Sequence, residues 1–157
     1  MSLEIERRFL LKNDNWKKFI TKKIYIEQGY LSKSLDDWIS RIRFTGKEFK
    51  IALKKHINGF TNFEFEYSIP QSDGEIIMSN LSNIIKKERF FLEVEKKSWI
   101  IDCFKENNYP LEIAEIELSN EEEDLFLPSF ISKEITGLTY YSNFNLANNP
   151  FSKWKED

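Results

Sequence analysis

Residues Leu3–Leu11 read LEIERRFLL, and this stretch decides the fold. In an extended strand, successive side chains point to opposite faces. Glu4, Glu6 and Arg8 then share one face, whereas the other face is apolar except for Arg7. The stretch therefore predicts a strand with one charged face and one mainly apolar face.

The same alternation recurs along the chain. Further strands are predicted at Ile24–Leu31, Trp38–Phe44, Glu48–Lys55, Phe60–Ile69, Lys87–Glu95, Ser98–Phe104 and Leu111–Leu118. Asn58-Gly59 is a strong hairpin signal between two of them. The charged faces together carry Glu4, Glu6, Arg8, Arg41, Arg43, Lys50, Lys54, Glu64, Glu66, Lys87, Arg89, Asp102, Glu115 and Glu117. The strand pattern indicates a mainly β protein of the α+β type.

Two architectures fit this alternation. An open antiparallel sheet would leave its charged face in water and rest its apolar face on helices. About eight strands are also enough to close into a barrel, which removes the exposed edges. The expected closed form is an antiparallel eight-stranded barrel with a charged lumen and with helices, predicted around residues 13–22 and 73–86, packed outside. A solvated helix start is predicted at Glu121–Asp124, and a short helical turn at Ser142–Ala147.

Composition narrows the function classes. The 157 residues fit one domain, 1–157, and 41% hydrophobic with 31% charged residues is typical of a globular protein. A net charge of -3 argues against a generally basic nucleic-acid binder. With a single cysteine and a single histidine, thiolate zinc sites and a Ser-His triad are excluded. No signal peptide and no apolar run of about 18 residues is present, so we expect a cytoplasmic protein without a membrane partner.

The spacing of the carboxylates indicates a metal site. They occur as i, i+2 doublets at Glu4/Glu6, Glu64/Glu66 and Glu115/Glu117. Like charges so placed repel, and a divalent cation relieves the repulsion while accepting their oxygens. Because the ligands would be oxygens, Mg²⁺ or Mn²⁺ is expected. The many basic residues on the same faces suit a polyanion, so the combination predicts a polyphosphate substrate.

These residues also carry a family resemblance. The stretch Glu4–Phe9 resembles the ExExK signature of the CYTH superfamily, the triphosphate tunnel metalloenzymes. The likeness continues in order through Gln28–Leu31, Arg41–Arg43, Lys54, Glu64–Glu66, Lys87–Phe90, Asp102, Ala114–Glu117 and Glu134–Thr136. The chain is most similar to the compact bacterial members. The resemblance implies an eight-stranded tunnel that binds a triphosphate with one or two divalent metals.

The resemblance also implies roles by position. Metal ligands would be Glu4, Glu6 and one or both of Glu115 and Glu117, with Glu64, Glu66 and Asp102 holding a second metal or orienting the attacking water. Phosphate-binding residues would be Arg41, Arg43, Lys54, Lys87 and Arg89, with Lys50 added by its place on the inward face. Arg8 and Tyr30 would lie near the reacting centre.

Two positions depart from the family pattern. The signature lysine is Arg8, a permanently charged fork in place of an ammonium. A basic residue that is usual before the second carboxylate pair is Asn62. We expect both changes to leave the metal site in place.

The expected function is metal-dependent hydrolysis of inorganic triphosphate to pyrophosphate and phosphate. Alternatives are a class IV-type adenylyl cyclase, a thiamine triphosphatase and a non-catalytic polyphosphate or nucleotide sensor. A structural β domain with all charges paired or solvated is the remaining alternative. The partner would be a small-molecule triphosphate rather than a nucleic acid, and the protein a monomer or homodimer. Trp38 and Trp99 are expected to serve in packing, and His56 to be a loop residue.

Overall fold

A computed structural model describes residues 2–32, 34 and 37–154. The strands are β1 (Leu3–Leu11), β2 (Ile20–Tyr30), β3 (Ile39–Phe44), β4 (Phe49–Asn58), β5 (Thr61–Ile69), β6 (Ile85–Val94), β7 (Lys97–Phe104), β8 (Glu112–Glu117) and β9 (Ile131–Glu134). The helices are α1 (Gln71–Ser79) and α2 (Asn143–Asn148), with short 3-10 helices η1 (Asn15–Phe19), η2 (Glu106–Asn108), η3 (Thr139–Tyr141) and η4 (Phe151–Lys153). No helix in the described ranges has the length and apolarity needed to cross a membrane.

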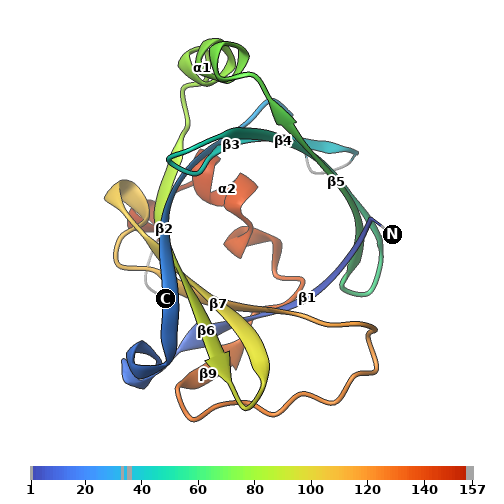
Figure 1. Cartoon of the computed structure of the whole chain (residues 1–157), viewed down its shortest axis with the longest axis vertical. Helices are drawn as coiled ribbons and strands as arrows, with labels where there is room; N and C mark the ends of the chain where they lie inside the picture. The colour runs from blue at the N-terminus through green and yellow to red at the C-terminus, as the bar shows by residue number, and fades with distance from the viewer. Residues whose placement is uncertain (1, 33, 35–36, 155–157) are drawn as a thin grey trace.

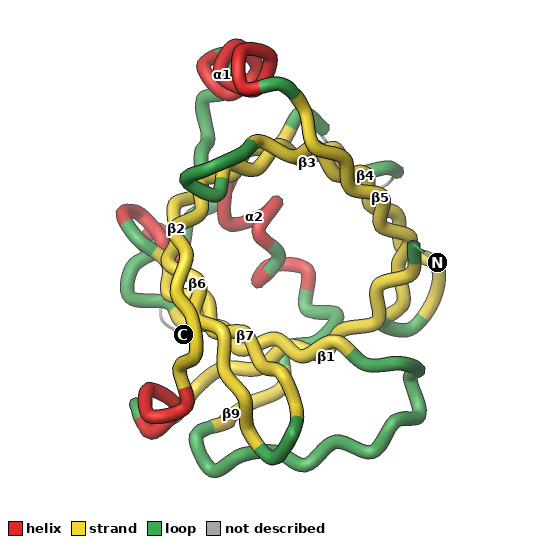
Figure 2. Tube along the Cα trace, in the orientation of Figure 1, coloured by secondary structure: helices red, strands yellow, loops and turns green. Residues whose placement is uncertain are grey.

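Eight antiparallel strands close into a barrel, as predicted. Their order is β5-β4-β3-β2-β6-β7-β8-β1, and β5 also pairs with β1, which completes the ring. Figure 1 shows this ring end-on, and Figure 2 shows the same trace by secondary structure. β9 pairs with the far end of β1, so β1 holds β8 along one edge and β5 and then β9 along the other.

The apolar core lies mainly on the outer surface of the barrel wall. The outward side chains of β1, β6, β7 and β8 are buried beneath η1 and the segment that follows β8. Trp16 of η1 packs on Phe90, with ring centroids 5.2 Å apart, and Phe9 packs on Trp99 at 5.8 Å. Burying this face outward directs the alternate, charged side chains into the lumen.

The location of helix α2 was predicted less well from the sequence than the locations of the strands. The expected turn at Ser142–Ala147 is a helix that lies inside the ring of strands (Figures 1 and 2). Its Leu146 is 1% exposed and packs in an apolar cluster with Phe104, Ile113 and Ile135. An apolar cluster thus anchors α2 at one end of the lumen.

Several predicted boundaries were wrong. The helix expected over residues 13–22 is only η1, because Ile20 already pairs with Leu92 as part of β2. The helix expected over residues 73–86 ends at Ser79, because Ile85 begins β6 opposite β2.

The helix start expected at Glu121–Asp124 is a turn instead. Its carboxylates bind the backbone elsewhere: Glu123 accepts from the Ser119 amide, and Glu121 from the Phe60 amide.

Truncation of the buried Leu146 side chain should destabilise the fold. We expect Leu146→Ala to lower the free energy of unfolding by about 2–5 kcal/mol, because it removes buried methyl groups and leaves a cavity. Urea denaturation followed by circular dichroism measures the change. Leu127→Ala, at a leucine that is 43% exposed, is the control and should shift stability little. Equal effects for the two variants would contradict the packing of α2 in the lumen.

Candidate active site

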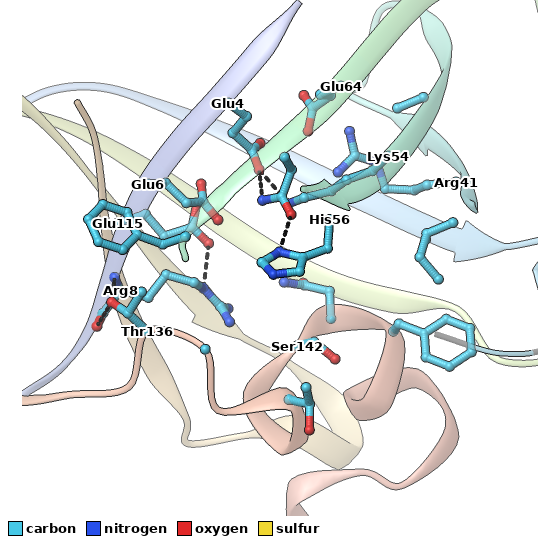
Figure 3. A pocket seen from close by; sticks show the side chains of 18 of the residues that line it. Glu4, Glu6, Arg8, Arg41, Lys54, His56, Glu64, Glu115, Thr136 and Ser142 are labelled. Carbon is cyan, nitrogen blue, oxygen red and sulfur yellow. Dashed lines mark hydrogen bonds and ion pairs between the residues drawn. The ribbon is translucent and has the colours of Figure 1, made fainter. Parts of the chain in front are cut away.

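The lumen contains a cavity of about 440 Å³ that is lined by strands and by the segment leading into α2. Its charged lining comprises Glu4, Glu6, Asp37, Glu64, Glu115, Glu117, Arg8, Arg41, Arg43, Lys54, Lys87 and Arg89, of which only Asp37 lies outside a strand. Tyr30, His56, Asn62, Thr136, Ser142 and Asn143 add neutral polar groups. The structure therefore brings most of the sequence-predicted site residues into one cavity (Figure 3).

The charges are divided between two arcs of the barrel. The five lining glutamates come from β5, β1 and β8, which are consecutive strands in the ring. The lining cations come from β4, β3 and β6, on the other arc, with Arg8 of β1 as the exception. The barrel order thus sets an acidic wall against a basic wall across one cavity.

The acidic wall is crowded with negative charge. Burial, followed by the charges of Glu115 and Glu4, raises the pKa of Glu6 to about 8. Burial also raises the pKa of Glu4 to about 7, although the nearby ammonium of Lys54 opposes the shift. One oxygen of Glu64, Oε2, is buried and has no hydrogen-bond partner within residues 2–32, 34 and 37–154. Burial and mutual repulsion thus favour the protonated forms of Glu4 and Glu6.

This donor set fits a hard divalent cation. It consists of carboxylate oxygens, one of them buried and unpartnered, which Mg²⁺ and Mn²⁺ accept. In the described ranges, no three Asp, Glu, His or Cys side chains are grouped closely enough to hold a metal ion as they stand. Glu4 instead accepts hydrogen bonds from Lys54 and, at 3.4 Å, from Asn62 Nδ2. Both partners contact the same oxygen of Glu4, Oε1.

The basic wall contains a buried hydrogen-bonded chain. Arg43 Nε donates to Gln28 Oε1 at 3.0 Å, and Gln28 Nε2 donates to the Tyr30 hydroxyl at 2.9 Å. Burial, together with the neighbouring cations Arg41 and Arg89, lowers the pKa of Arg43 to about 9. A site that places cations this close together suits an anion of high charge.

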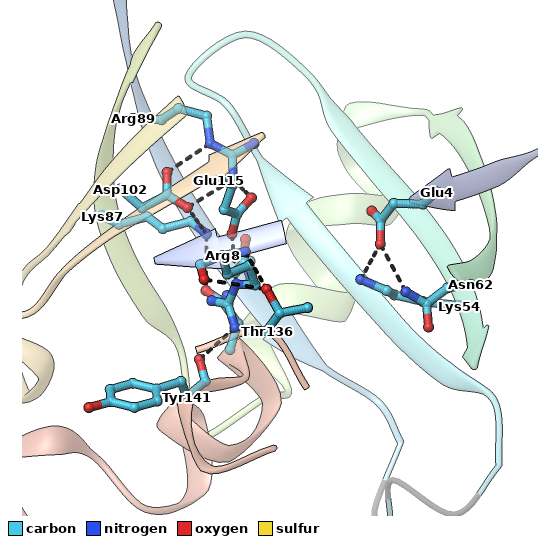
Figure 4. Close-up of polar contacts among 12 residues, drawn as sticks. Glu4, Arg8, Lys54, Asn62, Lys87, Arg89, Asp102, Glu115, Thr136 and Tyr141 are labelled. Carbon is cyan, nitrogen blue, oxygen red and sulfur yellow. Dashed lines mark hydrogen bonds and ion pairs between the residues drawn. The ribbon is translucent and has the colours of Figure 1, made fainter. Parts of the chain in front are cut away.

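Asp102 lies behind the basic wall rather than at the cavity surface. It is fully buried, and its two oxygens accept from Arg89 Nε and NH2 at 2.8 and 2.9 Å. Lys87 Nζ lies 2.8 Å from the same carboxylate (Figure 4). Burial would raise the pKa of Asp102, but the two cations hold it well below its usual value. Asp102 thus positions two cations, and its predicted metal role stays a prediction.

Glu66 and Lys50 form a separate group beside the cavity. Glu66 pairs with Arg41 at 3.2 Å and with Lys50 at 3.5 Å, and Lys50 also lies 3.4 Å from Glu48. Neither Glu66 nor Lys50 lines the cavity. In this arrangement Glu66 can orient Arg41, and the catalytic and ligand roles expected for the pair stay predictions.

The Arg8 side chain contacts both β8 and η3. Its Nε lies 3.3 Å from Glu115, its NH1 donates to the Tyr141 carbonyl at 3.0 Å, and its NH2 is buried without a partner. Tyr30 bonds to Gln28 rather than to Arg8. The guanidinium at the signature position therefore links β1 to the segment before α2 and leaves its NH2 nitrogen, with two N–H bonds, for a ligand.

Sequence reasoning missed several lining residues. His56, expected in a loop, lies in β4 opposite Asn62, and its Nδ1 is 3.3 Å from Asn62 Oδ1. His56 lies two residues after Lys54 in the same strand, so the two side chains share the inward face. This spacing was the sequence signal that could have identified His56 as a lining residue. Asn143 and Ser142 follow from no sequence pattern, because they reach the cavity through the insertion of α2.

The raised pKa of Glu6 predicts a pH dependence of stability in metal-free protein. A carboxyl whose pKa rises from 4.5 to about 8 on folding holds more protons in the folded state, so stability falls as pH rises between these values. We expect the melting temperature in EDTA to decrease over this range, and Glu6→Gln to reduce the decrease. The control Glu75→Gln, at an exposed position of α1, should leave this decrease in melting temperature unchanged. A flat wild-type profile would contradict the burial of Glu6.

Comparison with known proteins identifies the family of the chain. No family model matches it. An inorganic triphosphatase of Acetivibrio thermocellus is 33% identical over 158 residues, covering 99% of this chain and 100% of that protein. The crystal structure of an inorganic triphosphatase is 25% identical, with a TM-score of 0.68 over 92% of this chain and 93% of that one. A Pyrococcus horikoshii protein, 17% identical, shares the fold with a TM-score of 0.59 over 76% of this chain and 81% of its own. The chain belongs to the inorganic triphosphatase family of the CYTH superfamily.

Proposed function

We propose that the protein hydrolyses inorganic triphosphate to pyrophosphate and phosphate, and that the reaction depends on Mg²⁺ or Mn²⁺. The observation that carries the proposal is the division of one cavity into an acidic wall and a basic wall. The 33% identity to an inorganic triphosphatase over nearly the whole chain supports the same reaction.

The basic wall would bind the phosphate chain. Two guanidinium nitrogens, Arg8 NH2 and Arg41 Nε, are buried and have no hydrogen-bond partner among the described residues. Buried donors are normally satisfied, and charged donors make strong hydrogen bonds to phosphate oxygens. Arg43, Lys54 and Arg89 add positive charge around the same cavity. A triphosphate would satisfy the free donors and balance the cations.

The acidic wall would hold the metal. Glu4, Glu6 and Glu64, with Glu115 and Glu117, present the carboxylate oxygens for it. A bound divalent cation would neutralise charge on the triphosphate and favour attack by water. The unpartnered Oε2 of Glu64 could instead accept a hydrogen bond from that water and orient it.

The aromatic side chains of the cavity lining are Tyr30, His56, Phe60 and Phe144 rather than the two tryptophans considered from the sequence. Trp99 is buried in the outer core, and Trp38 stacks on Phe63 and packs at a tilt against Phe65 on the outer face of the barrel. As expected from the sequence, both tryptophans serve in packing, and neither lines the cavity. A thiamine or nucleoside group would therefore find no tryptophan platform there.

Removal of the first carboxylate doublet should abolish turnover. In Glu4→Gln/Glu6→Gln, two anionic ligands become neutral amides, so we expect Mg²⁺-dependent phosphate release from tripolyphosphate to fall at least about a hundredfold. Circular dichroism should show an unchanged fold. The matched control, Glu75→Gln/Glu93→Gln, changes the same charge at two exposed positions and should retain activity. Full activity in the lumen variant would reject the metal assignment.

A further inference from the structure

Lys87, a predicted phosphate-binding residue, is almost inaccessible. Its side chain is 1% exposed, and its ammonium lies 2.8 Å from Asp102 Oδ2. The same ammonium donates to Asn143 Oδ1 at 3.0 Å. Phe104 covers it from a third direction, with its ring centroid 5.4 Å away. Lys87 is therefore held by protein groups and offers little to a ligand.

The contact with Lys87 fixes the orientation of the Asn143 amide. An ammonium has only donors, so the amide oxygen must face it and the amide nitrogen must point elsewhere. Asn143 lines the cavity, and within the described part of the chain its Nδ2 has no hydrogen-bond acceptor. A neutral donor with a defined direction is thus left at the end of the cavity formed by α2.

Other contacts hold Asn143 in this position. Arg8 donates to the Tyr141 carbonyl just before α2, and the Tyr30 ring packs edge-on against Phe144 with centroids 5.5 Å apart. Leu146 anchors the same helix in the apolar cluster. Three residues of the predicted active site, Arg8, Tyr30 and Lys87, thus contact this one segment.

The side-chain amide nitrogens of the other two asparagines of α2, Asn145 and Asn148, are already engaged. Asn145 Nδ2 donates to the Tyr140 carbonyl, while Ser142 Oγ, at the N-cap of the helix, accepts from the Asn145 backbone amide. Asn148 Nδ2 donates to the Phe144 carbonyl. Asn143 differs from them because its oxygen is engaged while its nitrogen is not.

We propose that Asn143 is a substrate-binding residue whose amide N–H donates to a phosphate oxygen of the triphosphate, and that Lys87 is the positioning residue that aims this amide. The inference rests on the proposed function for the identity of the ligand. Under this proposal, the residue that contacts phosphate directly at this end of the cavity is Asn143 rather than Lys87. The proposal also makes α2 part of the substrate site as well as of the packing.

The variant Asn143→Asp tests the role of the amide nitrogen separately from that of the amide oxygen. The substitution keeps the shape and an oxygen for Lys87, but it replaces the donor with an anionic oxygen that repels phosphate. We expect KM for tripolyphosphate to rise at least about tenfold, with an unchanged melting temperature. Asn148→Asp makes the same change on the same helix at an exposed position and should leave KM as in wild type. Asn143→Ala should raise KM less, because it adds no charge.

A double-mutant cycle tests the role of Lys87. If Lys87 acts through Asn143, Lys87→Met should raise KM in wild type and have a much smaller effect in the Asn143→Ala background. Independent, additive effects on KM would mean that Lys87 contacts the substrate itself and would overturn its positioning role. Melting temperatures of all four proteins identify any variant that has lost the fold.

Calorimetric binding of tripolyphosphate, beside phosphate release, distinguishes this inference from the proposed function. Turnover by wild type together with an unchanged KM and affinity in Asn143→Asp would overturn the inference alone. Binding without hydrolysis by wild type, weakened in Asn143→Asp, would support the inference while rejecting hydrolysis.

Discussion

The pairing register of β1 is the constraint on which the rest of the structure depends. This strand closes the barrel by pairing with β5, then with β8 and β9, and it aligns Glu6 with Glu117 and Arg8 with Glu115. Because side chains alternate, a slip of one residue would turn its charged face outward and its apolar face inward. The outer core around Phe9 opposes such a slip. Packing outside the barrel therefore determines which charges meet inside it.

The two walls of the lumen satisfy their charges to different degrees. On the basic side, Asp102 lies between Lys87 and Arg89, so a buried anion holds two cations in place. On the acidic side, Glu6 and Glu115 repel each other, and an oxygen of Glu64 has no partner. Unbalanced buried charge destabilises a fold unless a ligand compensates it. The imbalance is concentrated where the proposed metal and triphosphate would bind.

The sequence predicted the barrel wall better than the contents of the barrel. Alternation alone placed Glu4, Lys54 and Glu64 on inward faces, because a strand's parity is a local property. It could not distinguish Asp102, which supports the wall from behind, from residues at the cavity surface, because depth within the wall depends on neighbouring strands. It also missed the place of Asn143, because six residues of helix carry no signal that they insert into a lumen. Family resemblance supplied the roles that parity alone did not.

The most direct test of the account is phosphate release from tripolyphosphate, ATP and thiamine triphosphate, each with Mg²⁺, with Mn²⁺ and with EDTA. The account predicts rapid release from tripolyphosphate with a divalent metal, little release from ATP or thiamine triphosphate, and none in EDTA. Tight binding of tripolyphosphate without release under any condition would contradict it and indicate a sensor. Formation of pyrophosphate and cyclic AMP from ATP would contradict it in favour of a cyclase.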